Sequence, residues 1–318
     1  MWKTVNREKS NEVDISPAYK EIHDTHSEKK TPRIGGVIIW LSVLATVATM
    51  YIISVLGIGD ELARVNFLSR NQTVLLVFGL IAGAGIGLLD DLMQIWVTKQ
   101  QQAHGFSGRS FFGIVLSVGL VCALWFFVKL DMSSIFVPFF GQLELGVLFI
   151  PFFTLVMLGV FSSGVIDGLD GLAGGVFAII FGAFGVIALI QNQIDISTFS
   201  FVVSSGILAF LWFNIPPARF YMGETGMLAL TVTLTLIAFL TNQVLLLLII
   251  GFPLVATALS SLIQIVSKRW FGVKVFKIAP LHHHFQAMGW SREKIVMRYW
   301  IISLICAIAG IVVVLIGQ

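Results

Sequence analysis

The amino-acid sequence predicts an all-α fold, a polytopic transmembrane helical bundle of about nine spans. Hydrophobic residues make up 57% of the 318 residues and charged residues only 12%, whereas soluble domains carry about 25% charged residues. The mean hydropathy is +0.93. The apolar residues also form runs of roughly the 20 residues that a helix needs to cross the hydrocarbon core of a bilayer. These observations indicate that a membrane is the solvent of this chain.

Nine apolar runs are the candidate spans. They cover residues 34–58, 73–98, 111–130, 146–163, 172–191, 197–213, 226–241, 243–265 and 299–317. The polar triplet Thr241-Asn242-Gln243 predicts a tight turn between the seventh and the eighth span. Pro253 predicts a kink in the eighth span, and Ser291 predicts the start of a short interfacial helix before the ninth.

The basic residues select the orientation, because cytoplasmic loops are enriched in lysine and arginine. Nine spans place the two termini on opposite sides of the membrane. All but three of the 20 lysines and arginines then fall on the side of the N-terminus, and the exceptions are Arg64, Arg70 and Lys129. The N-terminus is therefore predicted to be cytoplasmic.

The remaining composition limits the domain organisation and the class of partner. Residues 1–33 are polar and predict a cytoplasmic arm, which excludes a secretory signal peptide, and residues 34–318 predict a single membrane-embedded domain. Cys122 and Cys306 lie inside apolar runs, which argues against a disulfide framework or a cysteine metal site. The basic residues flank spans and do not alternate with aromatic residues, so no nucleic-acid partner is expected.

Two pairs of aspartates are the first candidate functional residues. Asp90 and Asp91 lie near the cytoplasmic end of the second span, and acids within a membrane usually mark functional sites. They could hold Mg²⁺, activate a nucleophile, relay protons, or form a solvated helix end. Asp167 and Asp170 lie in a glycine-rich segment, and their spacing predicts that they share one helical face. A calcium-like loop and a helix cap are the alternatives for that segment.

The third motif lies between the sixth and the seventh span. Pro216 and Pro217 predict a non-helical return to the membrane after the sixth span. Glu224 then precedes the seventh span as a functional or a capping acid.

Half of the chain's six histidines are consecutive, at His282, His283 and His284. Adjacent residues do not face one way on a helix, so phosphate recognition or proton transfer suits them better than one zinc ion. Lys29 and Lys30, before Thr31-Pro32-Arg33, are a membrane anchor or a phosphate contact.

All five motifs lie on the predicted cytoplasmic side. Carboxylates beside basic groups and histidines are the parts of Mg²⁺-dependent phosphoryl transfer, in which the metal neutralises a pyrophosphate and positioning supplies most of the catalysis. The motifs therefore favour an enzyme that joins a water-soluble phosphate donor to a lipid acceptor.

At these residues the chain resembles the polyprenyl-phosphate N-acetylhexosamine-1-phosphate transferase family, from about residue 29 to the C-terminus. The signals shared with the whole family are Asp90-Asp91, Asp167-Gly-Leu-Asp170-Gly, and Asn214 leading to Met222-Gly223. The signals similar to its muramoyl-pentapeptide branch are Pro280-Leu-His-His-His-Phe285, Gly289-Trp290 and Arg298-Tyr-Trp-Ile-Ile-Ser303.

The resemblance implies a magnesium-dependent phosphoglycosyl transferase of peptidoglycan synthesis. Undecaprenyl phosphate would attack the β-phosphate of UDP-N-acetylmuramoyl-pentapeptide, and lipid I and UMP would form. Mg²⁺ is the implied cofactor, membrane lipids are implied partners, and a homodimer is an option. The implied location is the bacterial cytoplasmic membrane, with residues 34–318 as the catalytic domain and the active site on the cytoplasmic side.

The resemblance also implies roles for single residues. Asp90 and Asp91 match the family's catalytic pair and Glu224 its magnesium-binding aspartate, so these three are the expected metal ligands. His282, His283 and His284 match its histidine cluster and join the expected catalytic set. The expected substrate-binding residues are Lys29, Lys30, Asp167, Gly168, Leu169, Asp170, Asn214 and Tyr221.

The chain departs from the family pattern at four points. Glu224 stands where most members have aspartate, Gln94 where a lysine follows the aspartate pair, and Gly164 where an asparagine is expected. The chain also has nine predicted spans where members usually have ten. Activity is expected to survive the Glu224 change because a carboxylate remains there.

Three rival functions stay open from the sequence. One is a transferase for another cell-envelope glycan, and one is an inactive relative that serves as a binding or scaffold protein. The third is a transporter or proton channel, but transporters tend to show repeated halves with sites near the bilayer midplane. No repeat relates residues 34–163 to residues 172–317, and the acids lie at one edge, so the sequence favours the enzyme.

Overall fold

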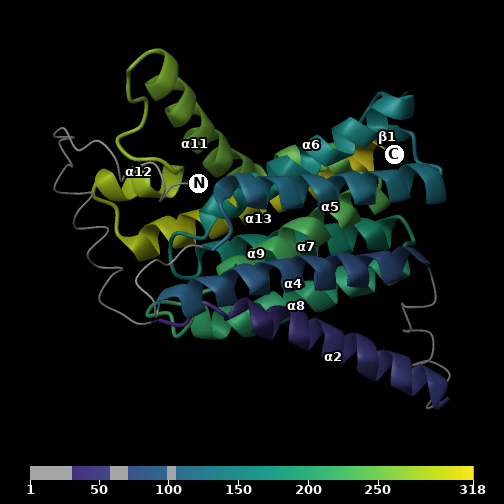
Figure 1. Cartoon of the computed structure of the whole chain (residues 1–318). Helices are drawn as coiled ribbons and strands as arrows, with labels where there is room; N and C mark the ends of the chain where they lie inside the picture. The colour runs from purple at the N-terminus through teal and green to yellow at the C-terminus, as the bar shows by residue number, and fades with distance from the viewer. Residues whose placement is uncertain (1–30, 58–70, 99–104, 318) are drawn as a thin grey trace.

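The computed structural model describes residues 31–57, 71–98 and 105–317. In them the chain forms a bundle of long helices that lie side by side (Figure 1). The helices are α2 (Gly36–Val55), α4 (Asn71–Thr98), α5 (Gly108–Lys129), α6 (Phe149–Ser162), α7 (Leu172–Ile190), α8 (Ile194–Asn214), α9 (Gly223–Leu240), α10 (Leu247–Ile250), α11 (Phe252–Trp270), α12 (Leu281–Ala287) and α13 (Arg292–Gly317).

Short elements complete the fold of the described residues. They are the strands β1 (Ser134–Val137) and β2 (Gly141–Glu144) and the 3₁₀ helices η2 (Gly146–Leu148), η3 (Ser163–Ile166) and η4 (Val244–Leu246). Within these residues, eight helices are long and apolar enough to cross a membrane, and a bent pair raises the number to nine. The predicted all-α, polytopic membrane bundle is therefore confirmed, and nine spans are reached when the bent pair counts as one.

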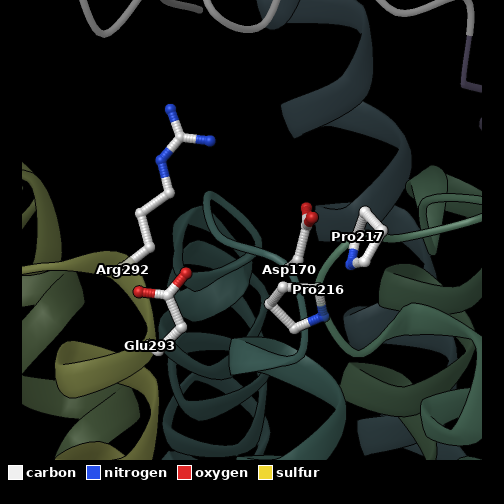
Figure 2. Close-up of a pocket in the computed structure, with 5 residues that line it drawn as sticks. All are labelled: Asp170, Pro216, Pro217, Arg292 and Glu293. Atoms are coloured by element: carbon white, nitrogen blue, oxygen red, sulfur yellow. The ribbon is translucent and has the colours of Figure 1, made fainter.

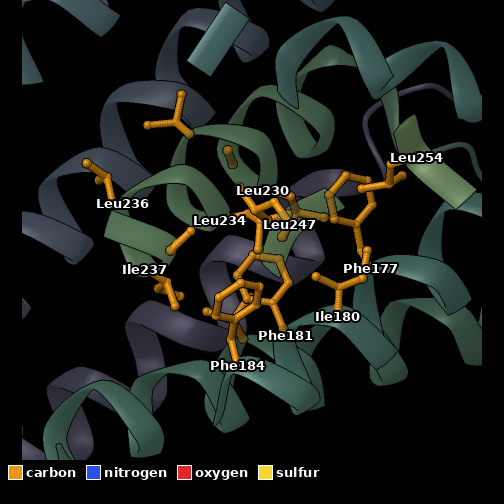
Figure 3. Close-up of a cluster of buried hydrophobic side chains, with 14 of the residues drawn as sticks. Phe177, Ile180, Phe181, Phe184, Leu230, Leu234, Leu236, Ile237, Leu247 and Leu254 are labelled. Carbon is orange, nitrogen blue, oxygen red and sulfur yellow. The ribbon is translucent and has the colours of Figure 1, made fainter. Parts of the chain in front are cut away.

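Helix α9 is the buried centre of the bundle. Every residue from Thr225 to Leu240 is buried, and the helix packs against α4, α6, α2 and α7. Figure 3 shows Phe181 and Phe184 of α7 gathered with Leu230 and Leu234 of α9. A helix that is apolar on all faces lies either in the interior of a protein or in lipid, and the neighbouring helices place this span in the interior.

The threonines of α9 do not leave unpaired groups in this apolar centre. The hydroxyls of Thr231, Thr233 and Thr235 donate to the carbonyl oxygens of Met227, Ala229 and Thr231, at 2.8, 2.7 and 2.8 Å. A buried hydroxyl without a partner costs several kcal/mol, about 2–7 by different scales. Bonding four residues back along the same helix removes that cost without a partner from another helix.

Three glycines of α4 form its contact with α9. Gly79, Gly83 and Gly87 are four residues apart and lie on one helical face. A Cβ at Gly83 would meet the backbone of Leu228 and Ala229, and one at Gly87 would collide with the carbonyl of Glu224. Small residues at this spacing let two membrane helices approach backbone to backbone. This contact fixes the position of α4 along the axis of α9, and so the position of the acidic end of α4 relative to the start of α9.

Three details differ from the sequence-based expectation. The eighth span bends by 84° at Gly251, rather than at Pro253. Pro253 lies in the first turn of α11, where its missing N–H would have no helical partner anyway.

The last span begins at Arg292 and runs unbroken to Gly317, so Ser291 precedes a continuous span rather than a separate interfacial helix. The β1–β2 hairpin was not predicted. It is fixed by a bond from the Phe136 N–H to Asn242 Oδ1 at 3.0 Å, and Asn242 itself forms the predicted tight turn, with φ 53°.

Two alanine substitutions two residues apart in α4 test the glycine contact. Gly87→Ala should lower the free energy of unfolding by about 1–3 kcal/mol, the usual cost of forcing extra atoms into a packed interior. Gly85→Ala is the matched control, since nothing lies within 4 Å of a Cβ there, and it should be neutral or stabilise by about 0.5–1 kcal/mol. Thermal unfolding in detergent measures both, and equal melting temperatures would contradict the contact.

Candidate active site

The predicted motifs meet at one end of the bundle. The second half of α4, the turn that follows η3, the loop between α8 and α9, and α12 all lie at the end opposite the β1–β2 hairpin (Figure 1). The expectation that the acidic and histidine motifs share one face is therefore confirmed for the described residues. Lys29 and Lys30 lie outside them, so their predicted role stays a prediction.

Asp91 anchors the N-terminus of α9. Its side chain is only 3% exposed, and its oxygens accept from the backbone N–H groups of Glu224, at 3.2 Å, and Thr225, at 2.9 Å. The first N–H groups of a helix have no partner inside the helix, and the helix dipole favours an anion at that point. Asp91 therefore fixes where Glu224 stands, and Thr225 is a contact that the sequence did not indicate.

Asp90 is held by a different set of donors. It is also 3% exposed, and it accepts from Gln94 Nε2 and from the Phe106 N–H, each at 2.6 Å. Gln94 Oε1 in turn accepts from Arg33 Nη1 at 3.3 Å. Gln94, which stands where a lysine was expected, is thus a direct partner of the first aspartate.

The start of α2 is joined to the loop before α9 by its backbone. Tyr221 N–H donates to Pro32 O at 2.8 Å, and the N–H groups of Gly35 and Gly36 donate to Tyr221 O and Met222 O, each at 2.9 Å. Tyr221, an expected substrate-binding residue, therefore also joins the loop to α2. The joint places Arg33 beside the carboxylates.

Asp167 and Asp170 lie in a turn, so the predicted shared helical face is wrong. The helical geometry ends with η3 at Ile166, and Gly171 adopts a positive φ of 78° before α7 begins. Asp170 Oδ2 accepts from the Ala218 N–H at 3.1 Å. The turn joins the loop between α8 and α9 instead of continuing a helix.

Asn214 and Leu169 hold this turn in place. Asn214 is buried, and its amide accepts from Gly171 N–H and donates to Phe220 O, both at 2.9 Å. Leu169 is buried in the core. Both residues were expected to bind substrate, and in the structure their side chains contact the protein interior.

Trp300 of α13, which was not predicted, adds a bond from its indole N–H to Gly171 O at 3.2 Å. The resemblance had marked this position only as part of a motif, without a role.

A pocket of about 330 Å³ opens beside the turn. It is lined by Asp170, Pro216, Pro217, Arg292 and Glu293, and Figure 2 shows the Asp170, Arg292 and Glu293 side chains pointing to the same side. Arg292 and Glu293 begin α13 and were not predicted as site residues. Arg292 and Glu293 therefore place one positive and one negative charge at the pocket.

The three histidines of α12 have three different surroundings. His282 is fully buried against Gly168, where a Cβ would collide with its Nε2. Neither ring nitrogen has a hydrogen-bond partner among the described residues. His283 Nδ1 bonds Gln286 Oε1 at 2.6 Å, and His284 Nδ1 accepts from the Lys277 N–H at 3.2 Å.

Burial, followed by the nearby His283, holds the pKa of His282 well below 6.5. The ring is therefore neutral at neutral pH. A neutral imidazole offers one donor and one acceptor, and the Nε2 atom of His282 faces Gly168. His282 can thus exchange hydrogen bonds with a ligand without changing charge.

The carboxylates form one cluster of negative charge. Asp91, Asp90 and Asp167 are all close enough for their charges to act on Glu224. Burial, and then the charges of Asp170 and Asp91, raise the pKa of Asp167 from 3.8 to about 7, while Arg33 partly offsets them. Crowded carboxylates of this kind attract a cation.

The cluster fits Mg²⁺ bound together with a phosphate. In the residues that the structure describes, no three Asp, Glu, His or Cys side chains form a ready-made metal site. Mg²⁺ usually takes one or two protein carboxylates and completes its shell with waters and substrate phosphates. Glu224 beside Asp90 and Asp91 supplies hard oxygen donors of this kind, so the donor set suits the metal.

The raised pKa of Asp167 gives a prediction about stability and pH. The pKa of Asp167 in the folded chain lies above its value in the unfolded chain. The contribution of this residue to the free energy of unfolding therefore falls as pH rises from about 4 to about 7, and then levels off. Asp167→Asn removes this titration, so the melting temperature of the variant should rise relative to the unmodified chain between about pH 5 and pH 8. Thermal unfolding in detergent with a chelator measures the difference.

Asp131→Asn is the matched control, on an exposed residue with φ 52°, a conformation that asparagine tolerates. Its melting temperature should follow the unmodified chain at every pH. A constant offset between Asp167→Asn and the unmodified chain would show that Asp167 does not titrate in this range.

Comparison with known proteins agrees with the geometry. The sequence profile of glycosyl transferase family 4 matches residues 72–242, a range that holds both aspartate pairs and Glu224. The chain is 34% identical over 293 residues to the phospho-N-acetylmuramoyl-pentapeptide-transferase of Geobacillus thermodenitrificans, covering 90% of this chain and 85% of the relative.

The transferases of the same name from Bacillus mycoides and Bacillus licheniformis are 34% and 33% identical, with the same coverage. The predicted resemblance is thus confirmed by similarity along most of the chain. We conclude that the chain belongs to glycosyl transferase family 4, in the group of the phospho-N-acetylmuramoyl-pentapeptide-transferases.

Proposed function

We propose that the chain transfers phospho-N-acetylmuramoyl-pentapeptide from its UDP-linked donor to undecaprenyl phosphate, forming lipid I and UMP. The observation that carries the proposal is the cluster of Asp90, Asp91, Asp167 and Glu224, which lies at one end of a membrane bundle. Beside it lies the neutral His282, whose ring nitrogens have no hydrogen-bond partner among the described residues. The names of the relatives support the choice of substrates.

The reaction exchanges one phosphorus–oxygen bond for another. A phosphate oxygen of the lipid acceptor attacks the β-phosphorus of the donor, and the bond from that phosphorus to the bridging oxygen breaks. UMP leaves with the bridging oxygen. Little covalent work falls to the protein in such a reaction, so catalysis comes from positioning and from charge stabilisation.

The residues of the chain supply these two contributions. Asp90 is fixed by two donors at 2.6 Å, so its carboxylate has a defined direction. Asp91 sets the position of Glu224 through the start of α9. Mg²⁺, when bound by Glu224 with Asp90 and Asp91, would neutralise the phosphates of the donor.

The donor side of the site is assigned to the turn after η3. His282 lies against Gly168 with both ring nitrogens unpaired among the described residues, so it can orient a polar group of the donor. The 330 Å³ pocket beside Asp170 gives the donor access from the open face. We propose that this face lies in the cytoplasm of a bacterium, at the inner membrane, because the sequence predicts nearly all basic residues on that side.

A transfer assay tests the proposal directly. Purified chain with undecaprenyl phosphate, Mg²⁺ and radiolabelled UDP-N-acetylmuramoyl-pentapeptide should release UMP and form a labelled lipid. Removing Mg²⁺ with EDTA should abolish both products. UDP-N-acetylglucosamine is the control donor, and its transfer to lipid without formation of lipid I would instead assign the chain to another glycan.

Glu224 carries a separate prediction. Glu224→Gln removes a charged oxygen ligand without changing size, and kcat should fall on the order of 100-fold, as for the loss of one stabilising group at a transition state. Glu224→Asp keeps the carboxylate and should retain activity within about tenfold. Titration of kcat with Mg²⁺ measures both variants, and unchanged Mg²⁺-dependent turnover in Glu224→Gln would remove Glu224 from the metal site.

A further inference from the structure

Arg33 stands at the edge of the carboxylate cluster on a firmly held backbone. The residues on either side of it bond the loop before α9, through Pro32 O at 2.8 Å and through the Gly35 N–H at 2.9 Å. Gly223 has a positive φ of 69°, and a Cβ there would collide with Arg33 O. The position of Arg33 relative to the start of α9 is therefore fixed by backbone contacts.

The Arg33 side chain reaches three carboxylates by two routes. It bonds Gln94, which bonds Asp90, so one chain of hydrogen bonds joins the guanidinium to that aspartate. Its charge also acts on Asp91 and on Asp167. Among the described residues, no other side-chain cation acts on either of these two carboxylates.

Most of the guanidinium remains available to a ligand. The side chain is exposed, and the bond to Gln94 at 3.3 Å is its one hydrogen bond among the described residues. A guanidinium carries five N–H donors in a fork that matches the oxygens of a phosphate. The remaining donors therefore belong to an exposed guanidinium.

An anionic substrate needs such a group here. Four carboxylates in one cluster repel a phosphate, and like charges in a partly buried site interact more strongly than in water. A cation at the edge of the cluster reduces the repulsion between the carboxylates and the phosphate. It also fixes the position of the phosphate through charge-assisted hydrogen bonds.

We propose that Arg33 is a phosphate-binding residue of this site and that Gln94 is its positioning residue, which links the arginine to Asp90. The ligand class is a phosphate ester. It is either the phosphomonoester of the lipid acceptor or the diphosphate of the donor. The inference rests on the proposed function for its substrates, but the binding of a phosphate by Arg33 can be measured without turnover.

The binding experiment uses simple probes on the whole chain in detergent, with EDTA present. Farnesyl phosphate should raise the melting temperature more than farnesol does, and the difference reports the phosphate group. UDP compared with uridine reports the diphosphate in the same way. Arg33→Gln should abolish one of these two differences, and which one it abolishes identifies the source of the phosphate.

Restoring a cation from the next helix separates phosphate binding from a structural role. In Arg33→Gln combined with Gln94→Lys, an ammonium group stands one helical turn from Asp90, and the lost difference in melting temperature should return. Arg269→Gln is the matched control, on an exposed arginine in the last turn of α11, and it should behave as the unmodified chain.

Turnover gives the second readout. Arg33→Gln should raise KM for one substrate about 10–100-fold, the effect of a lost hydrogen bond to a charged group, while KM for the other changes less than about threefold. A uniform fall in kcat with both KM values unchanged, or a double variant no better than Arg33→Gln, would overturn the proposal. If the unmodified chain showed the phosphate-dependent shifts but no transfer, the proposed function would fail while the Arg33 site stood.

Discussion

The contact between α4 and α9 determines the rest of the site. Gly79, Gly83 and Gly87 let the two backbones approach so closely that an added Cβ at Gly87 would collide with the carbonyl of Glu224. One turn further along α4, this approach brings Asp91 within hydrogen-bond distance of two N–H groups at the start of α9. Without the glycines, the carboxylate would lack its partners, and a buried charge without partners is costly.

The same constraint explains why the site lies at helix ends. Inside the bundle a buried polar group without a partner is costly, and Thr231, Thr233 and Thr235 of α9 find partners within the helix. At the helix ends the backbone has spare N–H and carbonyl groups, so acids and amides can be held there. Asp91, Asp170 and Asn214 all bond the backbone of another segment. These bonds fix the loops around the carboxylate cluster.

Sequence patterns predicted the bundle and the gathering of the motifs, because apolar length and intramembrane acids are strong signals. These patterns did not predict which side chains are available to a ligand and which contact only the protein. Asn214 and Leu169 resemble ligand contacts in a motif, yet both are buried in contacts with the protein itself. The turn of Asp167 and Asp170 was also missed, since their spacing suits a helix equally well. Arg33 was visible in its motif, but only folding brings it to Gln94.

The departures from the family pattern are compatible with one another in three dimensions. At Gly164 a Cβ would lie 3.4 Å from Met227 Cε, so the methionine occupies space next to the position where an asparagine was expected. Gln94 lacks the expected positive charge, but its carboxamide links Arg33 to Asp90. Glu224 begins in the first turn of α9 with its N–H held by Asp91, so its longer side chain starts from a fixed point. If these departures had disrupted the site, polar groups around the three positions would lack partners. Instead, Met227 packs beside Gly164, and Gln94 and the Glu224 N–H are both hydrogen-bonded.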